Sequence, residues 1–174
     1  MINRFQMKRI LAITAAVLAL WACSKTGPQL YSGYYSFKTG GTVEITGIMQ
    51  RAIGVVDTTI VRHVVAQSGQ MHILPTGDNT MKVTLNITAG DPLVLDATVV
   101  DNTLILKPAL QRVAVTSECT LDLIDYCYWE VSGTGTRYQN MVLFDLFYAG
   151  EYNQDGMKGI VTKSEISCIA TENE

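Results

Sequence analysis

Histidine and cysteine are the residue types in this chain best suited to chemistry, and both are scarce. The 174-residue sequence contains two histidines, His63 and His72, and four cysteines. A hairpin centred near Ser68 would place both imidazoles on one face of a sheet, but two imidazoles without a third ligand at a recognisable spacing do not make a metal site. No Gly-x-Ser-x-Gly elbow presents a serine nucleophile. We therefore expect no catalytic residue, no metal and no cofactor.

Three cysteines lie in the body of the chain and raise the question of a disulfide. Cys119 and Cys127 close a short loop, and we expect these two to pair in an oxidising compartment. Alternation within their segments makes Cys127 and Cys168 core-facing, so a Cys127–Cys168 bridge is a competing alternative. The fully reduced state is a third.

The N-terminal segment predicts export. Three basic residues precede an apolar run from Ile10 to Ala22, which is too short to span a bilayer and has the form of a signal peptide over residues 1–22. The run ends in Leu20-Trp21-Ala22-Cys23, which resembles the lipobox of bacterial lipoproteins. The resemblance implies that the Cys23 thiol is acylated and that Cys23 becomes the new N-terminus, with the membrane as a partner through the lipid.

The residues after Cys23 indicate which membrane such a lipoprotein would occupy. Ser24-Lys25 lacks the aspartate that retains enteric lipoproteins at the inner membrane, and no acidic cluster like the surface-export signal of Bacteroidetes lipoproteins precedes Glu44. The resemblance therefore implies the outer membrane, and its periplasmic face more than the cell surface. Residues 23–30 are short and polar with a Gly-Pro break, which is typical of a tether between lipid and fold.

The charge balance excludes a nucleic-acid partner. Without residues 1–22 the chain keeps ten basic and 16 acidic residues, a net charge of −6. Proteins that bind nucleic acid need a basic patch, and this sequence contains none.

Apolar residues alternate with polar ones along most of the chain. In Met81–Thr88 the odd positions are apolar and the even positions polar, which is the period of a strand with one wet face. Two strands at 34–38 and 42–48 are expected to flank Thr39-Gly40-Gly41 as a turn, although residues 45–53 also show helical spacing. Nine or ten such strands, joined by connections too short for crossover helices, predict an antiparallel sheet.

A chain of short antiparallel strands must hide its edges. We therefore expect an all-β fold over residues 31–174, a single antiparallel β-barrel of about 8–10 strands, with a β-sandwich as the alternative. The lipobox, the Gly33-Tyr-Tyr35 opening, the many hairpins and the late Val131-Ser-Gly-Thr-Gly135 strand resemble the calycin or lipocalin-like barrel lipoproteins common in Bacteroidetes. Glycines in that late strand would let it bend or let an aromatic ring lie against the backbone.

The expected function is binding without catalysis. A small apolar or amphipathic ligand would enter the barrel mouth, lined by Trp129, Met141, Phe144, Asp145 and Phe147. Asp145 is the single charge in the apolar strand 141–148, so a partner such as Arg112 or Arg137, or a wet interior, is expected if it faces inward. The alternative is a structural or interaction module of the cell envelope, whose strand 141–148 meets a partner protein or glycan. The interior volume discriminates between the two functions.

Overall fold

The computed structural model describes residues 26–88, 90–117 and 123–173, and most of these form strands. The signal peptide, Cys23 and Cys119 lie outside the described residues. A short 3-10 turn, η1 (Gly27–Leu30), precedes the first strand. In chain order the strands are β1 (Gly33–Arg51), β2 (Gly54–Val64), β3 (Ser68–Pro75), β4 (Thr80–Ile87), β5 (Leu93–Val100), β6 (Thr103–Thr116), β7 (Ile124–Tyr138), β8 (Met141–Ala149), β9 (Glu151–Gln154) and β10 (Met157–Glu172).

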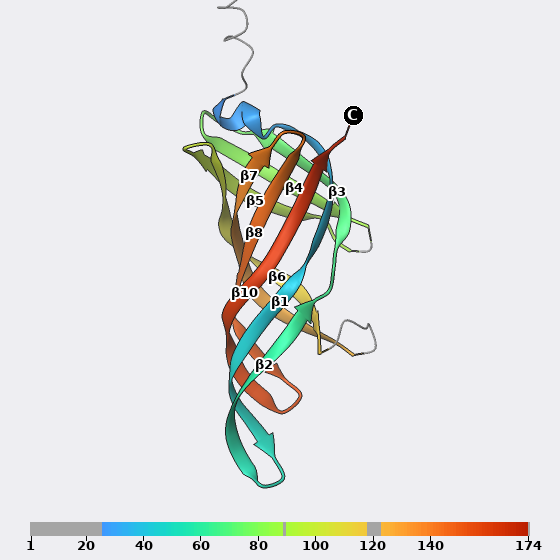
Figure 1. Cartoon of the computed structure of the whole chain (residues 1–174), viewed down its shortest axis with the longest axis vertical. Helices are drawn as coiled ribbons and strands as arrows, with labels where there is room; N and C mark the ends of the chain where they lie inside the picture. The colour runs from blue at the N-terminus through green and yellow to red at the C-terminus, as the bar shows by residue number, and fades with distance from the viewer. Residues whose placement is uncertain (1–25, 89, 118–122, 174) are drawn as a thin grey trace, which may run out of the picture.

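Eight of these strands close into a ring (Figure 1). Each pairs antiparallel with the next in the order β1, β3, β4, β5, β6, β7, β8 and β10, and β10 pairs with β1 to complete the circuit. Closure satisfies backbone groups that an open sheet leaves at its two edges. The all-β antiparallel prediction is confirmed, in a barrel-like arrangement. β2 and β9 extend the sheet at the end away from η1.

The long strand β1 determines how the ring is built. Its first part pairs with β3 from Gly33 to Lys38, and its second part pairs with β2 from Gly41 to Arg51. The expected turn at Thr39-Gly40-Gly41 is therefore wrong, because the strand continues through it and exchanges one neighbour for another. A Cβ at Gly41 would lie 2.1 Å from the carbonyl oxygen of Glu165, so glycine there allows β10 to approach. The helical spacing at 45–53 also belongs to strand, up to Arg51.

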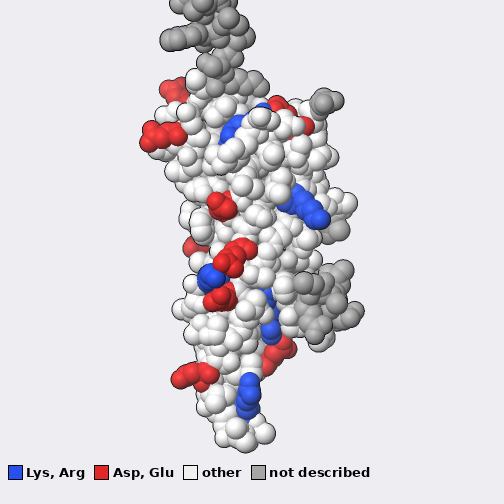
Figure 2. All heavy atoms as spheres, in the orientation of Figure 1, with Lys and Arg blue, Asp and Glu red and all other residues white. Residues whose placement is uncertain are grey.

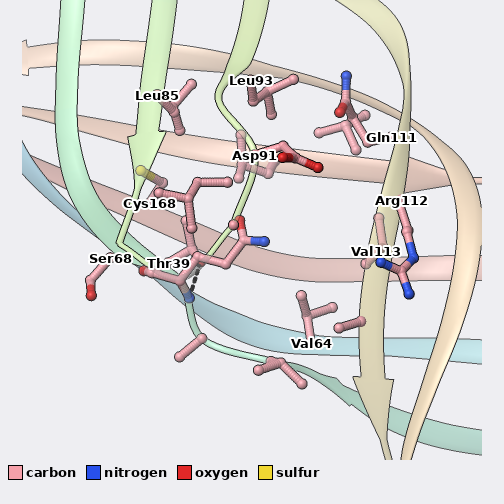
Figure 3. A pocket seen from close by; sticks show the side chains of 18 of the residues that line it. Thr39, Val64, Ser68, Leu85, Asp91, Leu93, Gln111, Arg112, Val113 and Cys168 are labelled. Atoms are coloured by element: carbon pink, nitrogen blue, oxygen red, sulfur yellow. Dashed lines mark hydrogen bonds between the residues drawn. The ribbon is translucent and has the colours of Figure 1, made fainter.

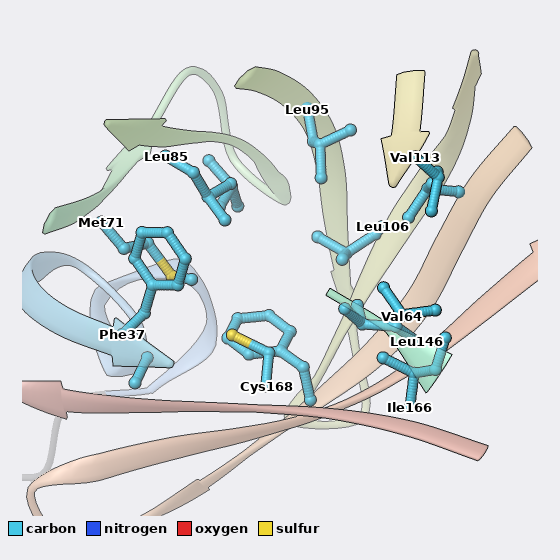
Figure 4. Packing of buried hydrophobic residues seen from close by; sticks show 14 of the residues in the cluster. Phe37, Val64, Met71, Leu85, Leu95, Leu106, Val113, Leu146, Ile166 and Cys168 are labelled. Atoms are coloured by element: carbon cyan, nitrogen blue, oxygen red, sulfur yellow. The ribbon is translucent and has the colours of Figure 1, made fainter. Parts of the chain in front are cut away.

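The core follows from the alternation. In β4, Met81, Val83 and Leu85 are buried, whereas Lys82 and Asn86 are exposed, as the sequence predicts. Figure 4 shows apolar side chains from strands around the ring converging on its interior. Burying such side chains contributes roughly 1.5–3 kcal/mol each. The core therefore lies inside the ring, and the outside carries polar residues together with exposed apolar ones.

Within the described part of the chain, no helix has the length and hydropathy needed to cross a membrane.

Candidate functional site

The pairing between β5 and β6 that helps close the ring is short. β5 pairs with β6 only from Ala97 to Val100, and β2 pairs with β6 only at His63 and Val64. Lys107–Val113 lies between these two pairings. On the side away from β7, no strand within the described residues pairs with this part of β6. We call this gap, between Leu93–Asp96 of β5 and Lys107–Val113 of β6, the seam.

A cavity of about 630 Å³ lies behind the seam. Its rim comes from the β2–β3 connection, the β4–β5 connection and β6. Figure 3 shows Asp91 and Leu93 on one side of the cavity and Gln111, Arg112 and Val113 of β6 on the other. The inner wall is largely apolar and includes Met71, Val83, Leu85, Leu95, Leu106, Val113, Val131, Phe144 and Leu146. The cavity therefore changes from apolar inside to polar at its mouth.

Two hydrogen bonds between Thr39 and Gln67 hold the β2–β3 connection, which forms one part of the rim. The Thr39 amide donates to the Gln67 carbonyl at 2.8 Å, and the Gln67 amide donates to Thr39 Oγ1 at 2.9 Å. Thr39 is one of two buried polar residues among those described. This reciprocal contact holds the β2–β3 connection against β1.

Two titratable groups in the cavity wall stay neutral. Burial raises the pKa of the Cys168 thiol to about 12 and raises the pKa of Tyr148 well above its ordinary value. Neither side chain carries a charge near neutral pH, and a protonated thiol is a poor nucleophile. The deep wall therefore offers apolar surface, one thiol and one phenol to a bound molecule.

The charged side chains that line the cavity lie at its rim and not in its inner wall. Arg112 and Asp91 are the charged residues that line the cavity among those described. The Arg112 guanidinium lies 3.8 Å from the centroid of the Tyr126 ring, in cation–π geometry. Over the face in Figure 2, basic and acidic side chains are interspersed. Arg112 is thus a positioned cation beside the cavity mouth.

Side chains close the end of the ring next to η1. The Tyr31 hydroxyl contacts the Gly135 carbonyl at 3.0 Å, and the Tyr35 hydroxyl donates to the Tyr31 carbonyl at 2.7 Å. Arg137 donates to the Tyr35 hydroxyl and forms an ion pair with Glu172. Burial raises the pKa of both tyrosines, so their hydroxyls remain neutral donors.

A second group of the same kind closes the end away from η1. The Tyr152 hydroxyl donates to Asp125 Oδ2 at 2.7 Å and accepts from Arg62 Nε at 3.2 Å. Arg62 also pairs with Asp155 at 3.4 Å. Met157 beside them is fully buried. Side chains thus fill both ends of the ring, and the polar rim of the cavity lies at the seam.

The structure separates the five residues expected to line the ligand site. Phe144 lines the cavity and is 1% exposed, and its ring lies over Gly135, where a Cβ would be 2.7 Å away. Met141, Asp145 and Phe147 point out from the ring, so the expected inward orientation of Met141 is corrected, and Phe144 rather than Phe147 faces inward.

Trp129 is buried and contacts a residue of the cavity wall, but it does not itself line the cavity. Its Nε1 donates to the Glu151 carbonyl at 2.8 Å, and its ring packs edge-on against Tyr148 at a centroid distance of 6.3 Å. Tyr148 lines the cavity, whereas Trp129 does not. Trp129 thus holds Tyr148 in place.

The expected partners of Asp145 have other contacts. Arg137 binds Tyr35 and Glu172, and Arg112 stacks on Tyr126. Asp145 is exposed and needs no buried partner, because solvent hydrates its charge.

The two histidines do not form the expected hairpin pair. β2 and β3 both pair with β1, which places His63 opposite Thr42 and His72 opposite Tyr34, eight positions apart along the same strand. His72 instead stacks on Tyr34, with ring centroids 3.8 Å apart. Among the described residues, no three His, Cys, Asp or Glu side chains gather in a metal-binding arrangement.

The strand register also shows how far apart Cys127 and Cys168 lie. Cys168 aligns with Phe144 and, through it, with Gly135, eight positions from Cys127 along β7. At about 3.3 Å per residue this separation far exceeds the reach of a disulfide, so the alternative bridge between Cys127 and Cys168 is incompatible with the fold. Both are buried and free in the structure. The Cys119–Cys127 pairing stays a prediction.

Sequence reasoning missed most of the rim. Gln67, Asp91 and Gln111 come from two connections and from the part of β6 that follows a register shift between Leu106 and Ala109. Pro108 inside an otherwise regular strand was the available signal, because proline is confined to strand edges and bulges.

No family model matches the sequence, and no relative is found among curated proteins.

Proposed function

We propose that this protein binds a small amphipathic or apolar ligand in the cavity behind the seam, as a non-enzymatic lipoprotein held at the outer membrane through Cys23. The observation that carries the proposal is the cavity itself. Its volume of about 630 Å³ lies within the range of roughly 300–1,000 Å³ typical of small-molecule sites. If side chains had filled the interior of the barrel, the interaction module would have been the remaining candidate function.

The chemistry of the wall supports an amphipathic ligand. The apolar part would lie against Leu85, Leu106 and Phe144, where it leaves water at a gain of about 25 cal/mol per Å² buried. The polar part would stay at the rim near Asp91 and Arg112, which keep contact with solvent. This arrangement avoids burying an unpaired charge.

The proposed anchor is compatible with access to the cavity. η1 and the C-terminus lie at the same end of the molecule (Figure 1), and Tyr31 and Tyr35 fill that end. Cys23 precedes Gly27 by four residues, a span of at most about 14 Å. The anchored end would face the membrane, and the seam in the side of the ring would open to the aqueous space beside it.

Native mass spectrometry of protein purified from its own host tests this function. We expect a co-purifying molecule of a few hundred daltons that is released on unfolding. A protein that carries no such molecule, and that also fails to take up an environment-sensitive apolar dye, would overturn ligand binding.

One observation favours the second candidate, an interaction module that contacts a partner protein or glycan. The outer face of β6, β7 and β8 carries Leu110, Tyr128 and Phe147, with exposed fractions of 65%, 67% and 49%. Exposed apolar and aromatic side chains of this kind are common in interaction surfaces. Loss of co-purifying partners on changing Tyr128 and Phe147 to Ser, with dye uptake unchanged, would support this candidate.

A further inference from the structure

Among the described residues, the backbone groups of β5 and β6 that face the seam pair with no neighbouring strand. On β5, the Val99 amide donates to the Asn79 carbonyl at 2.8 Å on the β4 side. Backbone groups alternate sides along a strand. The N–H and C=O groups of odd-numbered residues in β5 therefore point toward β4, and those of the even-numbered Val94 and Asp96 point into the seam. Both residues precede Ala97, where the pairing with β6 begins.

The same reasoning applies to β6. The Val65 amide donates to the Ala114 carbonyl at 2.9 Å on the β2 side. The even-numbered Leu110 and Arg112 therefore direct their N–H and C=O groups into the seam, whereas the N–H and C=O groups of their odd-numbered neighbours point toward β7. No backbone partner for these groups is found within the described residues. Two strand edges thus face each other across the cavity mouth.

We propose that the seam binds an extended segment of another polypeptide, which adds as a strand between β5 and β6 and completes the ring. Unpaired strand edges are templates for another strand, and strand addition is a recurrent mode of peptide recognition. The segment would be antiparallel to one edge and parallel to the other, because β5 and β6 are themselves antiparallel.

The surroundings of the seam specify the chemistry of this partner. Side chains on one face of the added strand would enter the cavity mouth between Leu95 and Val113, so apolar residues are required at alternate positions. Side chains on its other face would lie between Asp96 and Arg112, both exposed and of opposite charge, so polar residues are favoured there.

A second folded copy of this chain does not fit the same site. An added strand must pair on both sides at once, and the strands of a closed ring already have neighbours. A single extended segment has both of its edges free. This inference rests on the backbone edges and not on the proposed ligand, although a strand across the mouth would compete with ligand passage.

Peptide selection tests the proposal. A randomised heptapeptide library is selected against the purified protein, and enriched peptides are expected to alternate apolar and polar residues. Leu110→Pro removes an amide hydrogen that faces the seam, and proline is tolerated there because this amide has no partner in the ring. We expect peptide affinity to fall about tenfold or more in Leu110→Pro and to change by less than about threefold in Leu110→Ala, which keeps the amide and removes only an outer-face side chain.

Modified peptides provide a test that does not depend on the folding of a variant. Insertion between two edges uses the N–H groups of both parities, so N-methylation at either the odd or the even positions is expected to abolish binding. Loss with only one parity would show addition to a single edge and would overturn the proposal. The proposal would also be overturned if both N-methylated peptides kept their affinity, or if the library selection enriched no peptide. Dimers that form at high protein concentration and exclude the peptide would overturn it as well.

Hydrogen exchange locates the bound strand. The amides of Val94, Asp96, Leu110 and Arg112 are expected to exchange rapidly in the free protein and to slow at least tenfold with the selected peptide. Rapid exchange at all four in the complex would place the peptide elsewhere. Because a cavity dye reports ligand binding separately, failure of peptide binding and failure of the proposed function are distinguishable.

Discussion

The Tyr152 hydroxyl on β9 donates a hydrogen bond of 2.7 Å to the carboxylate of Asp125 at the start of β7. Arg62 completes this group by donating to the same hydroxyl. At the other end of the ring, Arg137 makes the equivalent contact with Tyr35. A tyrosine, an arginine and a carboxylate thus close each end, and the interior of the ring communicates with solvent through its side.

Loss of the Tyr152 hydroxyl is expected to destabilise the protein. Tyr152→Phe leaves the Asp125 carboxylate without its donor, and a hydrogen bond to a charged group contributes about 1.5–3 kcal/mol, reduced here because Asp125 is partly exposed. We expect the free energy of unfolding to fall by about 1–2 kcal/mol in urea denaturation. Tyr128→Phe is the control, because Tyr128 is 67% exposed. Equal stability of the two variants would contradict the role of Tyr152.

Filling the cavity is expected to block ligand uptake without unfolding the ring. Val113 lines the cavity at the seam, so Val113→Phe places a larger side chain into open space. We expect dye affinity to fall about tenfold or more, with the melting temperature unchanged or raised. Leu110→Phe on the outer face of the same strand is the matched control and should keep its affinity. A loss of about 1–3 kcal/mol of stability in Val113→Phe would show overpacking, and therefore no void at this position.

Local alternation was sufficient to predict the strands but not their partners. Met81–Thr88 and the segment around Trp129 have the expected faces because period-2 burial is a local property. The Thr39-Gly40-Gly41 segment has the composition of a turn, yet Gly41 is required for the close approach of β10. This contact joins residues more than 120 positions apart in the chain, and no local pattern contains it.

The candidate site was harder to predict for two physical reasons. β8 is apolar on both faces, so alternation alone could not decide between Phe144 and Phe147. The packing of Phe144 against Gly135 decides it, and the glycine-rich strand had indicated such a ring contact. The seam arises from the different lengths of pairing that β2 and β5 make with β6, which depend on long-range register.

Acylation of Cys23 is expected to hold the protein at the membrane. In Cys23→Ala, labelling by an alkyne analogue of palmitate should disappear and the protein should move from the membrane fraction to the soluble one, because position 23 no longer has a thiol to carry the lipid. Cys168→Ala is the control and should keep both the label and the membrane location, since its thiol is buried. Persistent labelling of Cys23→Ala would refute the anchor.

The buried thiol of Cys168 is expected to make stability depend on alkaline pH. Burial raises the pKa of this thiol from about 9 to about 12 in the folded protein, so the folded state keeps its proton where the unfolded chain loses it. Its contribution is fully present below pH 9 and is lost as pH rises toward 12.

Urea denaturation under reducing conditions between pH 8 and pH 10.5 measures this effect. Other buried groups titrate in the same range, so the informative quantity is the difference between the wild type and Cys168→Ala. One thiol can contribute a slope of at most about 1.4 kcal/mol per pH unit. We expect the stability of the wild type to fall more steeply than that of Cys168→Ala, by an amount approaching this limit above pH 9. Parallel curves for the two proteins would mean that solvent reaches the thiol and that the wall around it is open.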